Sequence, residues 1–421
     1  MKILSIFSTF PPYVYGGGED SALNLTKWLA SQGHQMGVLT AAEKGQQELQ
    51  GETIDGLEVW RLRYRRQYTY STHANAPKWQ KPLWYLQDHL DPDNRRKMSA
   101  VLDEFQPDCT MVHVIAGLGY NSLYEIGRRD IPTVYFMHDL NLVCFKGGMF
   151  SNGKECVRRC TACKVIGRLR FSAVSSIARL AFCSPSRANL EAAAEYISVK
   201  KYLNAVLLNA NTYPEPTAIR AAGTKVRFLY VGRLHAAKGV DVLLNALDEV
   251  AKSFEFELNI LGGGQEANLL RERFGDRGWC RFHGHVTQQQ VSNFMQGSDV
   301  LCVPSIWREN SPGVVIHALS QGLPVIGSDK GGIPELVNHE RNGLLVRAGD
   351  TDAWRRALEG VLIEPKILET WRANLAEEAD LFDPVRLGQK LLEFIVDTTR
   401  ISPGNSSRSV AKAEMSQLSD F

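Results

Sequence analysis

The chain lacks several features that mark proteins outside the ordinary globular class. It has almost no net charge, since 48 lysine and arginine residues face 46 aspartate and glutamate residues. No apolar run approaches the roughly 18 residues of a membrane-spanning helix, and the apolar start, residues 1–7, is too short for a signal-peptide core. Eight cysteines in 421 residues are too few for a secreted disulfide framework. We therefore expect a cytoplasmic protein with no nucleic-acid partner.

The composition is that of a folded protein with more than one domain. Hydrophobic residues make up 44% of the chain and charged residues 22%, as in ordinary globular domains. At roughly 150 residues per domain, the length predicts two or three domains.

Two halves of the chain show the same alternation of short apolar strands, glycine-bearing loops and helices. In the first half we expect strands at residues 2–7, 35–40, 109–114 and 133–137, and helices at 21–31 and 122–128. The second half has strands at 226–231, 257–261, 299–303 and 324–327, and helices at 240–250 and 314–319. This pattern predicts an α/β fold with two Rossmann-like, doubly wound domains.

The predicted domain boundary lies just before the proline-containing segment 214–216. We assign residues 1–205 to an N-terminal Rossmann-like domain and 206–400 to a C-terminal Rossmann-like domain, whose last helix could pack back on the first domain. Residues 401–421 lose hydrophobic periodicity and are expected to be disordered.

Two loops of the second half carry candidate chemistry. Arg233 and Lys238 lie in a glycine-bounded loop after strand 226–231, where two cations could neutralise a diphosphate. The segment 304–313 contains Glu309 and ends at Pro312, which suits a first helical turn and leaves backbone N–H groups free for an anion. Glu309 would repel phosphate, so it is better suited to accept hydrogen bonds from sugar hydroxyls. The alternative for each loop is a surface turn with solvated charges.

The order and spacing of these segments resemble the retaining glycosyltransferases of family 4, also called group 1, which have the GT-B fold. The resemblance covers nearly the whole chain and is carried by Gly16, Gly17 and Gly18, by His138 and Asp139, by Gly232, Arg233, Lys238 and Gly239, and by residues 262–264, 304–305, 309–313 and 331–335. It implies two Rossmann-like domains facing a cleft, with residues 1–205 on the acceptor side and residues 206–400 binding the nucleotide sugar. It also implies transfer of a sugar from a nucleotide-sugar donor, with retention of configuration and without an obligatory divalent cation.

Matching positions imply the roles of individual residues. Arg233 and Lys238 would hold the donor diphosphate and stabilise the leaving group, Glu309 would contact hydroxyls of the donor sugar, and His138 would lie near the reaction centre. The implied donor-binding residues are Gly17, Gly18, Phe282, Gly284, Asn310, Ser311, Pro312, Gly313, Val314 and His317.

One position departs from the family. The usual pattern is Glu-x7-Glu, whose second glutamate accepts hydrogen bonds from the ribose, whereas this chain has His317 there. A neutral imidazole accepts through only one ring nitrogen, so a bidentate grip on the ribose should be lost or rearranged.

Four cysteines fall close together in the first half: Cys144, Cys156, Cys160 and Cys163. Four thiolates at this spacing could close a structural zinc site that folds an irregular loop. Unligated reduced thiols, disulfides and an iron-sulfur cluster are the alternatives. Catalysis itself is expected to need no cofactor.

The acceptor is less well specified. Aromatic and basic residues alternate in 60–70 and 79–85, and cations gather in 140–187, which favours a cell-envelope glycan or lipid-linked acceptor and peripheral contact with the inner face of the membrane. The sequence thus predicts a nucleotide-sugar-dependent glycosyltransferase. A GT-B nucleotide-sugar epimerase and a non-catalytic, zinc-stabilised binding protein are the alternatives.

Overall fold

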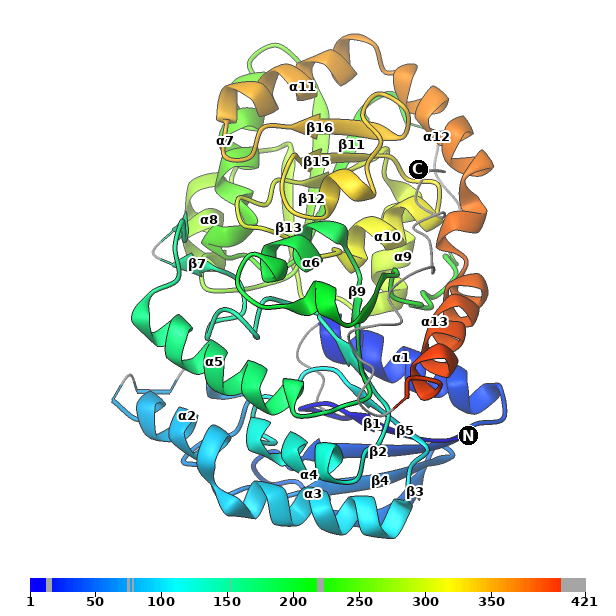
Figure 1. Cartoon of the computed structure of the whole chain (residues 1–421). Coiled ribbons are helices and arrows are strands. Elements are labelled where there is room, and N and C mark those ends of the chain that lie inside the picture. The colour runs from blue at the N-terminus through cyan, green and yellow to red at the C-terminus, as the bar shows by residue number, and fades with distance from the viewer. Residues whose placement is uncertain (13–16, 74–75, 78, 152, 218–222, 403–421) are drawn as a thin grey trace. The chain divides into compact units, whose positions relative to one another are not determined.

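The computed structural model of the chain describes residues 1–12, 17–73, 76–77, 79–151, 153–217 and 223–402 (Figure 1). It divides into two compact units. Unit 1 contains residues 1–148 and 158–211 and the described residues from Leu387 onward, and unit 2 contains residues 149–157 and 212–386. The contacts thus divide the chain at 211/212, rather than at the predicted 205/206. Residues 403–421, most of the predicted disordered tail, lie outside the described residues.

Unit 1 is built on an eight-stranded sheet with the order β10-β9-β6-β5-β1-β2-β4-β3. Neighbouring strands are parallel except β3 and β4, which are antiparallel. The central strands β5, β6 and β9 are buried along their whole length, as expected when both faces of a parallel sheet are covered. The strands are β1 (Lys2–Ile6), β2 (Gln35–Ala41), β3 (Leu49–Ile54), β4 (Leu57–Leu62), β5 (Cys109–Val112), β6 (Thr133–Phe136), β9 (Leu180–Ser184) and β10 (Leu203–Val206).

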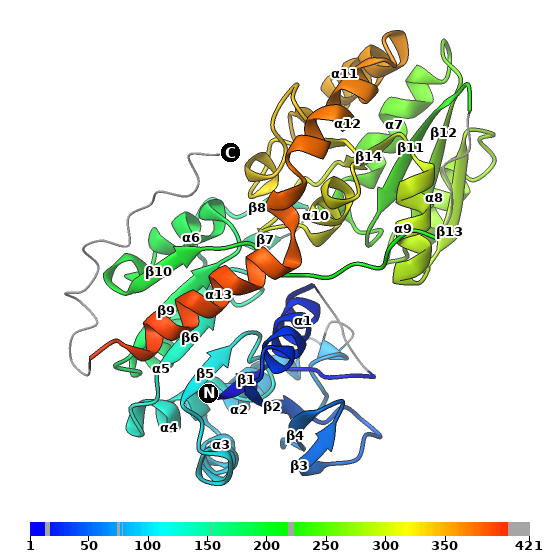
Figure 2. The same cartoon turned by 90° about the vertical axis from the view of Figure 1, so that its right-hand side faces the viewer.

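Seven α-helices belong wholly or mainly to unit 1: α1 (Gly17–Ser31), α2 (Lys81–Leu90), α3 (Pro92–Phe105), α4 (Leu123–Arg128), α5 (Thr161–Ser175), α6 (Arg187–Ala194) and most of α13 (Pro384–Thr399). Figure 2 shows α13, from the far end of the chain, beside the sheet of unit 1. Gly388 of α13 packs so closely on Trp28 of α1 that an added Cβ would lie 2.6 Å from the indole. The buried residues Leu391, Phe394 and Ile401 therefore complete the core of unit 1.

Unit 2 has a six-stranded parallel sheet with the order β13-β12-β11-β14-β15-β16. The strands are β11 (Val226–Val231), β12 (Phe256–Leu261), β13 (Cys280–Gly284), β14 (Val300–Val303), β15 (Val325–Ser328) and β16 (Gly343–Val346). The α-helices that cover them are α7 (Val240–Val250), α8 (Ala267–Phe274), α9 (Gln288–Gly297), α10 (Gly313–Ser320), α11 (Thr351–Ile363) and α12 (Ile367–Glu377). A small hairpin, β7 (Phe150–Ser151) with β8 (Lys154–Glu155), also belongs to this unit, where Glu155 pairs with Arg308 at 3.2 Å and Lys330 at 2.6 Å.

Both sheets have a topological switch point, where the strand order reverses. In unit 2 it lies between β11 and β14, and in unit 1 between β1 and β5. In sheets of this class, ligands bind beyond the carboxyl ends of the strands at that point. The structure confirms the predicted α/β class and its parallel sheets.

Two local sequence predictions need correction. Gly17 and Gly18 are expected in a loop before a helix at residue 21, but α1 already begins at Gly17. Arg61 and Arg66 belong to the basic stretch 60–70 that is expected to face an anionic partner, but Arg61 is only 7% exposed and the Arg66 side chain only 4% exposed. Arg66 instead pairs with buried Asp88 at 3.4 Å, so these two cations are not available to a lipid surface.

Candidate functional site

Two loops meet at the switch point of unit 2. The loop after β11 runs from Gly232 to Gly239 and includes a single 3₁₀ turn, Ala236–Lys238. The loop after β14 is joined to it by two backbone hydrogen bonds, in which the N–H groups of Ile306 and Trp307 donate to the carbonyl of Ala237 at 3.0 and 3.2 Å. Backbone hydrogen bonds therefore hold the loop after β11 and the loop after β14 together.

An ion pair joins the loops. Lys238 Nζ lies 2.7 Å from Glu309 Oε1, and Ser305 Oγ donates to the same oxygen at 2.6 Å. The Lys238 side chain remains 22% exposed, whereas that of Glu309 is only 7% exposed. An ammonium group has three N–H donors, so Lys238 can hold Glu309 and still donate to a ligand.

Glu309 is held as a carboxylate. Burial alone would raise its pKa, but the Lys238 ammonium and the hydrogen bonds from Lys238 and Ser305 outweigh burial and lower the pKa below its usual range. A buried, ionised carboxylate in this position is a hydrogen-bond acceptor and suits hydroxyl groups.

Two glycines fix the backbone around this pair. Gly331 has φ +62°, and a Cβ there would lie 2.1 Å from the carbonyl oxygen of Glu309. The next residue, Gly332, donates its N–H to that oxygen at 2.9 Å. Gly239 also has φ +62°, with the carbonyl oxygen of Pro304 2.1 Å from its Cβ position. Only glycine allows both the left-handed conformation and the close approach.

Arg233 lies on the same loop as Lys238 but does not join the ion pair. Its side chain is exposed and forms no hydrogen bond or ion pair with the residues that the structure describes. The backbone on either side is fixed, because Tyr230 Oη donates to the Arg233 carbonyl at 2.9 Å and the Leu234 N–H donates to Gly263 at 2.8 Å. Arg233 is thus a free cation on a fixed loop.

The predicted phosphate-facing segment forms the start of α10. Pro312 is the N-cap residue and Gly313 the first helical residue, and no side chain caps the helix. Ser311 Oγ is buried without a partner among the described residues. Asn310, Ser311 and Val314 flank this turn. Backbone N–H groups at an uncapped helix start are available to an anion.

His317 lies inside unit 2. Its ring stacks on Tyr213 with centroids 4.1 Å apart, and its Nε2 is 3.0 Å from Ser292 Oγ and 3.1 Å from Gln321 Nε2. Burial lowers its pKa to about 4, so it is neutral near pH 7. Because Nε2 already has two partners, a ribose contact would have to use Nδ1. Contact between His317 and the donor stays a prediction.

Phe282 and Gly284, which are predicted to bind the donor, lie in β13, the edge strand of the unit 2 sheet. The Arg271 guanidinium lies 5.9 Å from the ring centroid of Phe282, and the Gly284 carbonyl accepts the Gly262 N–H at 2.7 Å. The Gly262 backbone in turn packs on Gly232, whose oxygen lies 2.0 Å from the Gly262 Cβ position. The loop after β12 therefore contacts both the end of β13 and the loop after β11.

In unit 1, the predicted His138 follows β6 and packs against the start of α1. A Cβ on Gly18 would lie 3.2 Å from His138 Cβ, so the glycine allows the helix to approach the histidine. His138 Nε2 lies 2.9 Å from Nδ1 of His113, which follows β5. Burial lowers the pKa of His138 to about 4. His113 is not among the predicted site residues, because the sequence pattern places it inside the predicted strand 109–114.

Two carboxyl groups near His138 are not among the predicted site residues: buried Glu19 and partly buried Asp139. Glu19, in the first turn of α1, is 4% exposed, and burial raises its pKa to about 7. Burial likewise raises the pKa of Asp139 to about 6, although hydrogen bonds from Asn141 oppose the shift. Fully buried Arg170 anchors the loop that follows, donating to the Asn141 carbonyl at 2.9 Å.

The four cysteines are free thiols in this structure. Cys163 is buried and its thiol interacts with those of Cys144 and Cys160, while Cys160 is the exposed N-cap residue of α5. No group of three or more histidine, cysteine or acidic side chains among the described residues is arranged to hold a metal ion. Zinc bound by Cys144, Cys156, Cys160 and Cys163 stays a prediction.

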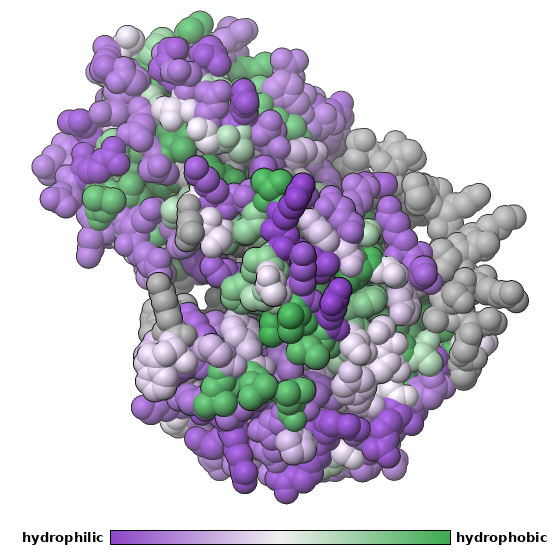
Figure 3. Space-filling view, turned by 60° about the vertical axis from the view of Figure 1, so that its left-hand side comes forward, coloured by the Kyte–Doolittle hydropathy of each residue, from purple (hydrophilic) through white to green (hydrophobic). Residues whose placement is uncertain are grey.

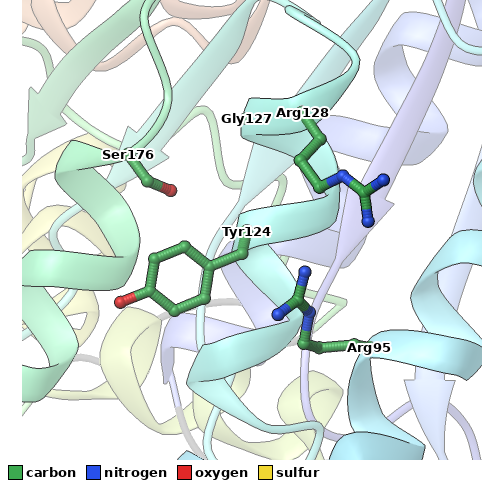
Figure 4. Close-up of a pocket in the computed structure, with 5 residues that line it drawn as sticks. All are labelled: Arg95, Tyr124, Gly127, Arg128 and Ser176. Atoms are coloured by element: carbon green, nitrogen blue, oxygen red, sulfur yellow. The ribbon is translucent and has the colours of Figure 1, made fainter.

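A surface pocket of about 370 Å³ lies elsewhere in unit 1, between α3, α4 and the end of α5. Figure 4 shows the guanidinium of Arg95 beside the ring of Tyr124 and that of Arg128 farther from the ring. Arg95 pairs with Glu125 at 2.6 Å. The pocket contains none of the predicted site residues.

Comparison with known proteins agrees with this description. The family model described as "Glycosyl transferases group 1" matches residues 225–364, and the "Glycosyl transferase 4-like domain" matches residues 16–185. The phosphatidyl-myo-inositol mannosyltransferase of Mycolicibacterium smegmatis is 26% identical over 388 residues, covering 88% of each chain. An uncharacterized glycosyltransferase of Methanocaldococcus jannaschii is 24% identical over 84% of this chain and 87% of its own.

Solved structures show the same fold. Sucrose-phosphate synthase from Thermosynechococcus elongatus has a TM-score of 0.74 at 17% identity and covers 95% of this chain and 100% of its own. The Anabaena protein HepE in complex with UDP-glucose has a TM-score of 0.64 at 17% identity, covering 94% and 100%. The chain is a glycosyltransferase with the GT-B fold. It belongs to the group 1 glycosyltransferases of the family 4 type.

Proposed function

We propose that the protein transfers a hexose from a nucleotide-sugar donor to a glycan or lipid-linked acceptor, with retention of configuration. In this proposal, Arg233 and Lys238 hold the donor diphosphate and the start of α10 adds backbone donors. Glu309 accepts hydrogen bonds from hydroxyls of the sugar. The observation that carries the proposal is the 2.7 Å contact between Lys238 and Glu309 at the switch point of unit 2.

The contact supports the proposal because it places a phosphate-binding charge beside a hydroxyl-binding charge. A nucleotide sugar presents these two groups in sequence, a diphosphate and then a ring with hydroxyls. Bound UDP-glucose in the HepE structure and the mannosyltransferase name of the mycobacterial relative are in keeping with such a donor.

The direct test is a panel of nucleotide sugars incubated with the full chain, with and without candidate acceptors. We expect one donor to bind and to release its nucleoside diphosphate, and the anomeric configuration of the isolated product to match that of the donor. Absence of binding and turnover with every donor would contradict the proposal. An epimerase would convert the sugar without transferring it to the acceptor, which sugar analysis distinguishes.

We further propose that unit 1 contacts an anionic membrane surface, where a lipid-linked acceptor would be found. No helix among the described residues is long and apolar enough to cross a bilayer. Helix α2, however, exposes Leu83, Leu86 and Leu90 by 47, 53 and 58%, at a spacing that places them on one side of the helix. Trp79, just before it, is 78% exposed.

Helix α5 adds apolar and basic side chains to this surface. Val165 and Leu169 are 51 and 40% exposed, and Lys164 and Arg168 are exposed beside them. The two helices are neighbours, since the guanidinium of Arg170 on α5 lies 6.0 Å from the ring centroid of Tyr85 on α2. Figure 3, which turns this side forward, shows hydrophobic patches bordered by hydrophilic side chains. Exposed apolar residues flanked by cations favour an anionic lipid surface.

Flotation with vesicles tests this part. We expect binding to vesicles rich in anionic lipid, loss of binding in the triple variant Leu83→Ser, Leu86→Ser, Leu90→Ser, and no loss in Ile363→Ser, which changes a 71% exposed residue of unit 2. Equal flotation of all three proteins, or none at low salt, would remove the membrane surface from the proposal while leaving the donor assay unaffected.

A further inference from the structure

His113 and His138 lie just beyond the carboxyl ends of two neighbouring strands. Strands β5 and β6 pair in parallel, and His113 directly follows β5, the strand at the switch point of unit 1. Its backbone is anchored there, because its N–H donates to the Ile6 carbonyl at 3.0 Å. The side chain of His113 is 3% exposed, whereas His138 is only partly buried.

The two rings share one hydrogen bond. His113 Nδ1 and His138 Nε2 are 2.9 Å apart, and the ring planes are inclined by 19°. Burial keeps both imidazoles neutral near pH 7, since it lowers the pKa of each. One proton lies between the two nitrogens, and the tautomers of both residues depend on which nitrogen carries it.

Either His113 or His138 donates the proton in this hydrogen bond. The surroundings of the other ring nitrogen of His113, Nε2, decide which residue is the donor. His113 Nε2 is buried and has no hydrogen-bond partner among the residues that the structure describes. The nearby rings are Phe136, stacked at 4.3 Å, and Phe7, edge-on at 6.3 Å, and neither offers a lone pair. If His138 donated, His113 would carry its proton on Nε2 and bury an orphaned N–H. If His113 donates, Nε2 is only an unpaired acceptor. Orphaned buried N–H groups are the rarer of the two.

We propose that His113 is a positioning residue that donates Nδ1–H to His138 Nε2, so that His138 carries its own proton on Nδ1. His138 then acts toward the substrate as a neutral hydrogen-bond donor through Nδ1. In this state it offers no free ring nitrogen for taking a proton from an acceptor hydroxyl. This assignment deepens the proposed function and rests on it for the substrate contact, but the tautomer itself does not depend on the substrate.

The test is nitrogen NMR of the full chain labelled with ¹⁵N-histidine, with His138 assigned by the loss of its signals in His138→Gln. We expect the Nδ1–H tautomer for His138 in the native protein. In His113→Phe, which cannot donate, His138 should lose this preference. In His113→Asn, the amide N–H replaces the Nδ1–H donor, and the Nδ1–H tautomer should persist. A native His138 in the Nε2–H form, or an unchanged tautomer in His113→Phe, would overturn the proposal.

Kinetics provide a second measurement. For variants of unchanged melting temperature, kcat should fall about 10- to 100-fold in His113→Phe with little change in donor KM, and His113→Asn should recover most of it. Equal losses in both variants would indicate a packing role and contradict the proposal. If no donor is turned over by the native protein, the proposed function fails, but the NMR result still decides the tautomer.

Discussion

Units 1 and 2 use different chemistry at the same place in similar sheets. In unit 2, the loops after the switch-point strands carry an ionised pair, Lys238 and Glu309, and a free cation, Arg233. In unit 1, the loop after the switch-point strand β5 carries His113, and the loop after its neighbour β6 carries His138. Burial keeps both imidazoles neutral. Charged groups suit a charged ligand, whereas neutral imidazoles suit hydrogen bonds to uncharged oxygen atoms. We therefore propose that unit 2 supplies the ionic part of substrate binding.

The largest expected effect comes from removing the charge of Lys238. In Lys238→Met, we expect donor turnover to fall by about 10²- to 10³-fold, because a preorganised donor to the leaving group is lost. The control Lys252→Met removes an exposed ammonium that pairs only with exposed Glu249, and it should leave turnover unchanged. Near-native kcat/KM in a folded Lys238→Met protein would contradict the ionic assignment to unit 2.

The second-largest expected effect is on stability and concerns the backbone around Glu309. Gly331→Ala should lower the free energy of unfolding by about 1 to 3 kcal/mol, because the new Cβ would lie 2.1 Å from the Glu309 carbonyl at a positive φ. The control Gly360→Ala, inside α11 with no atom within 4 Å of its Cβ position, should stabilise unit 2 by about 0.5 to 1 kcal/mol. Urea unfolding measures both, and equal values for the two variants would exclude the steric explanation.

In unit 1, the buried carboxyl group of Glu19 should make the stability of the protein depend on pH. The pKa of Glu19 is raised to about 7 from 4.5, so above pH 4.5 the unfolded chain releases its proton more readily than the folded one. Glu19 therefore destabilises the fold as the pH rises, and the effect is complete above about pH 7. Glu19→Gln should stabilise the protein by about 2 to 3 kcal/mol at pH 8 and by little at pH 4. Urea unfolding at both pH values would measure the effect, with Glu191→Gln, which changes an exposed residue of α6, as the control. The same gain at both pH values would refute the titration of Glu19.

The smallest expected effect concerns the four clustered cysteines, of which Cys144, Cys160 and Cys163 lie in unit 1 and Cys156 lies in unit 2. Hydrogen bonds from backbone N–H groups, that of Cys163 foremost, lower the pKa of Cys160, whereas burial raises the pKa of Cys163 to about 12. Iodoacetamide at pH 7 should therefore alkylate Cys160 first, as peptide mass mapping would show. Protection of Cys144, Cys156, Cys160 and Cys163 together, released by a chelator, would instead support the predicted zinc site.

Local sequence signals predicted the parts of unit 2 that depend on nearby residues. The strand 226–231 and the helix 240–250 agree with β11 and α7 at both ends, because apolar periodicity and glycine boundaries coincide there. Lys238 and Glu309 were both chosen as site residues because loops at neighbouring strand ends meet. Their direct ion pair was not predicted, since it depends on how the two loops dock.

The sequence signals failed where distant parts of the chain decide the outcome. The local sequence around Arg66 is that of a solvated cation. The side chain is nevertheless buried, where it pairs with Asp88, 22 residues away. His113 was taken as part of a strand, because the buried apolar run continues through it. Nothing in the local sequence marks its contact with His138.

Helix α13 has a consequence for how the protein is made. Unit 1 begins at the first residue, but its core includes Leu391, Phe394 and Ile401. The carbonyl of Ile401 also accepts a hydrogen bond from Arg179 Nε at 2.7 Å. A ribosome translating this chain must therefore complete all of unit 2 before the N-terminal half can close its interior. Nascent chains that stall after Arg386 should carry an uncovered apolar face and depend on chaperones.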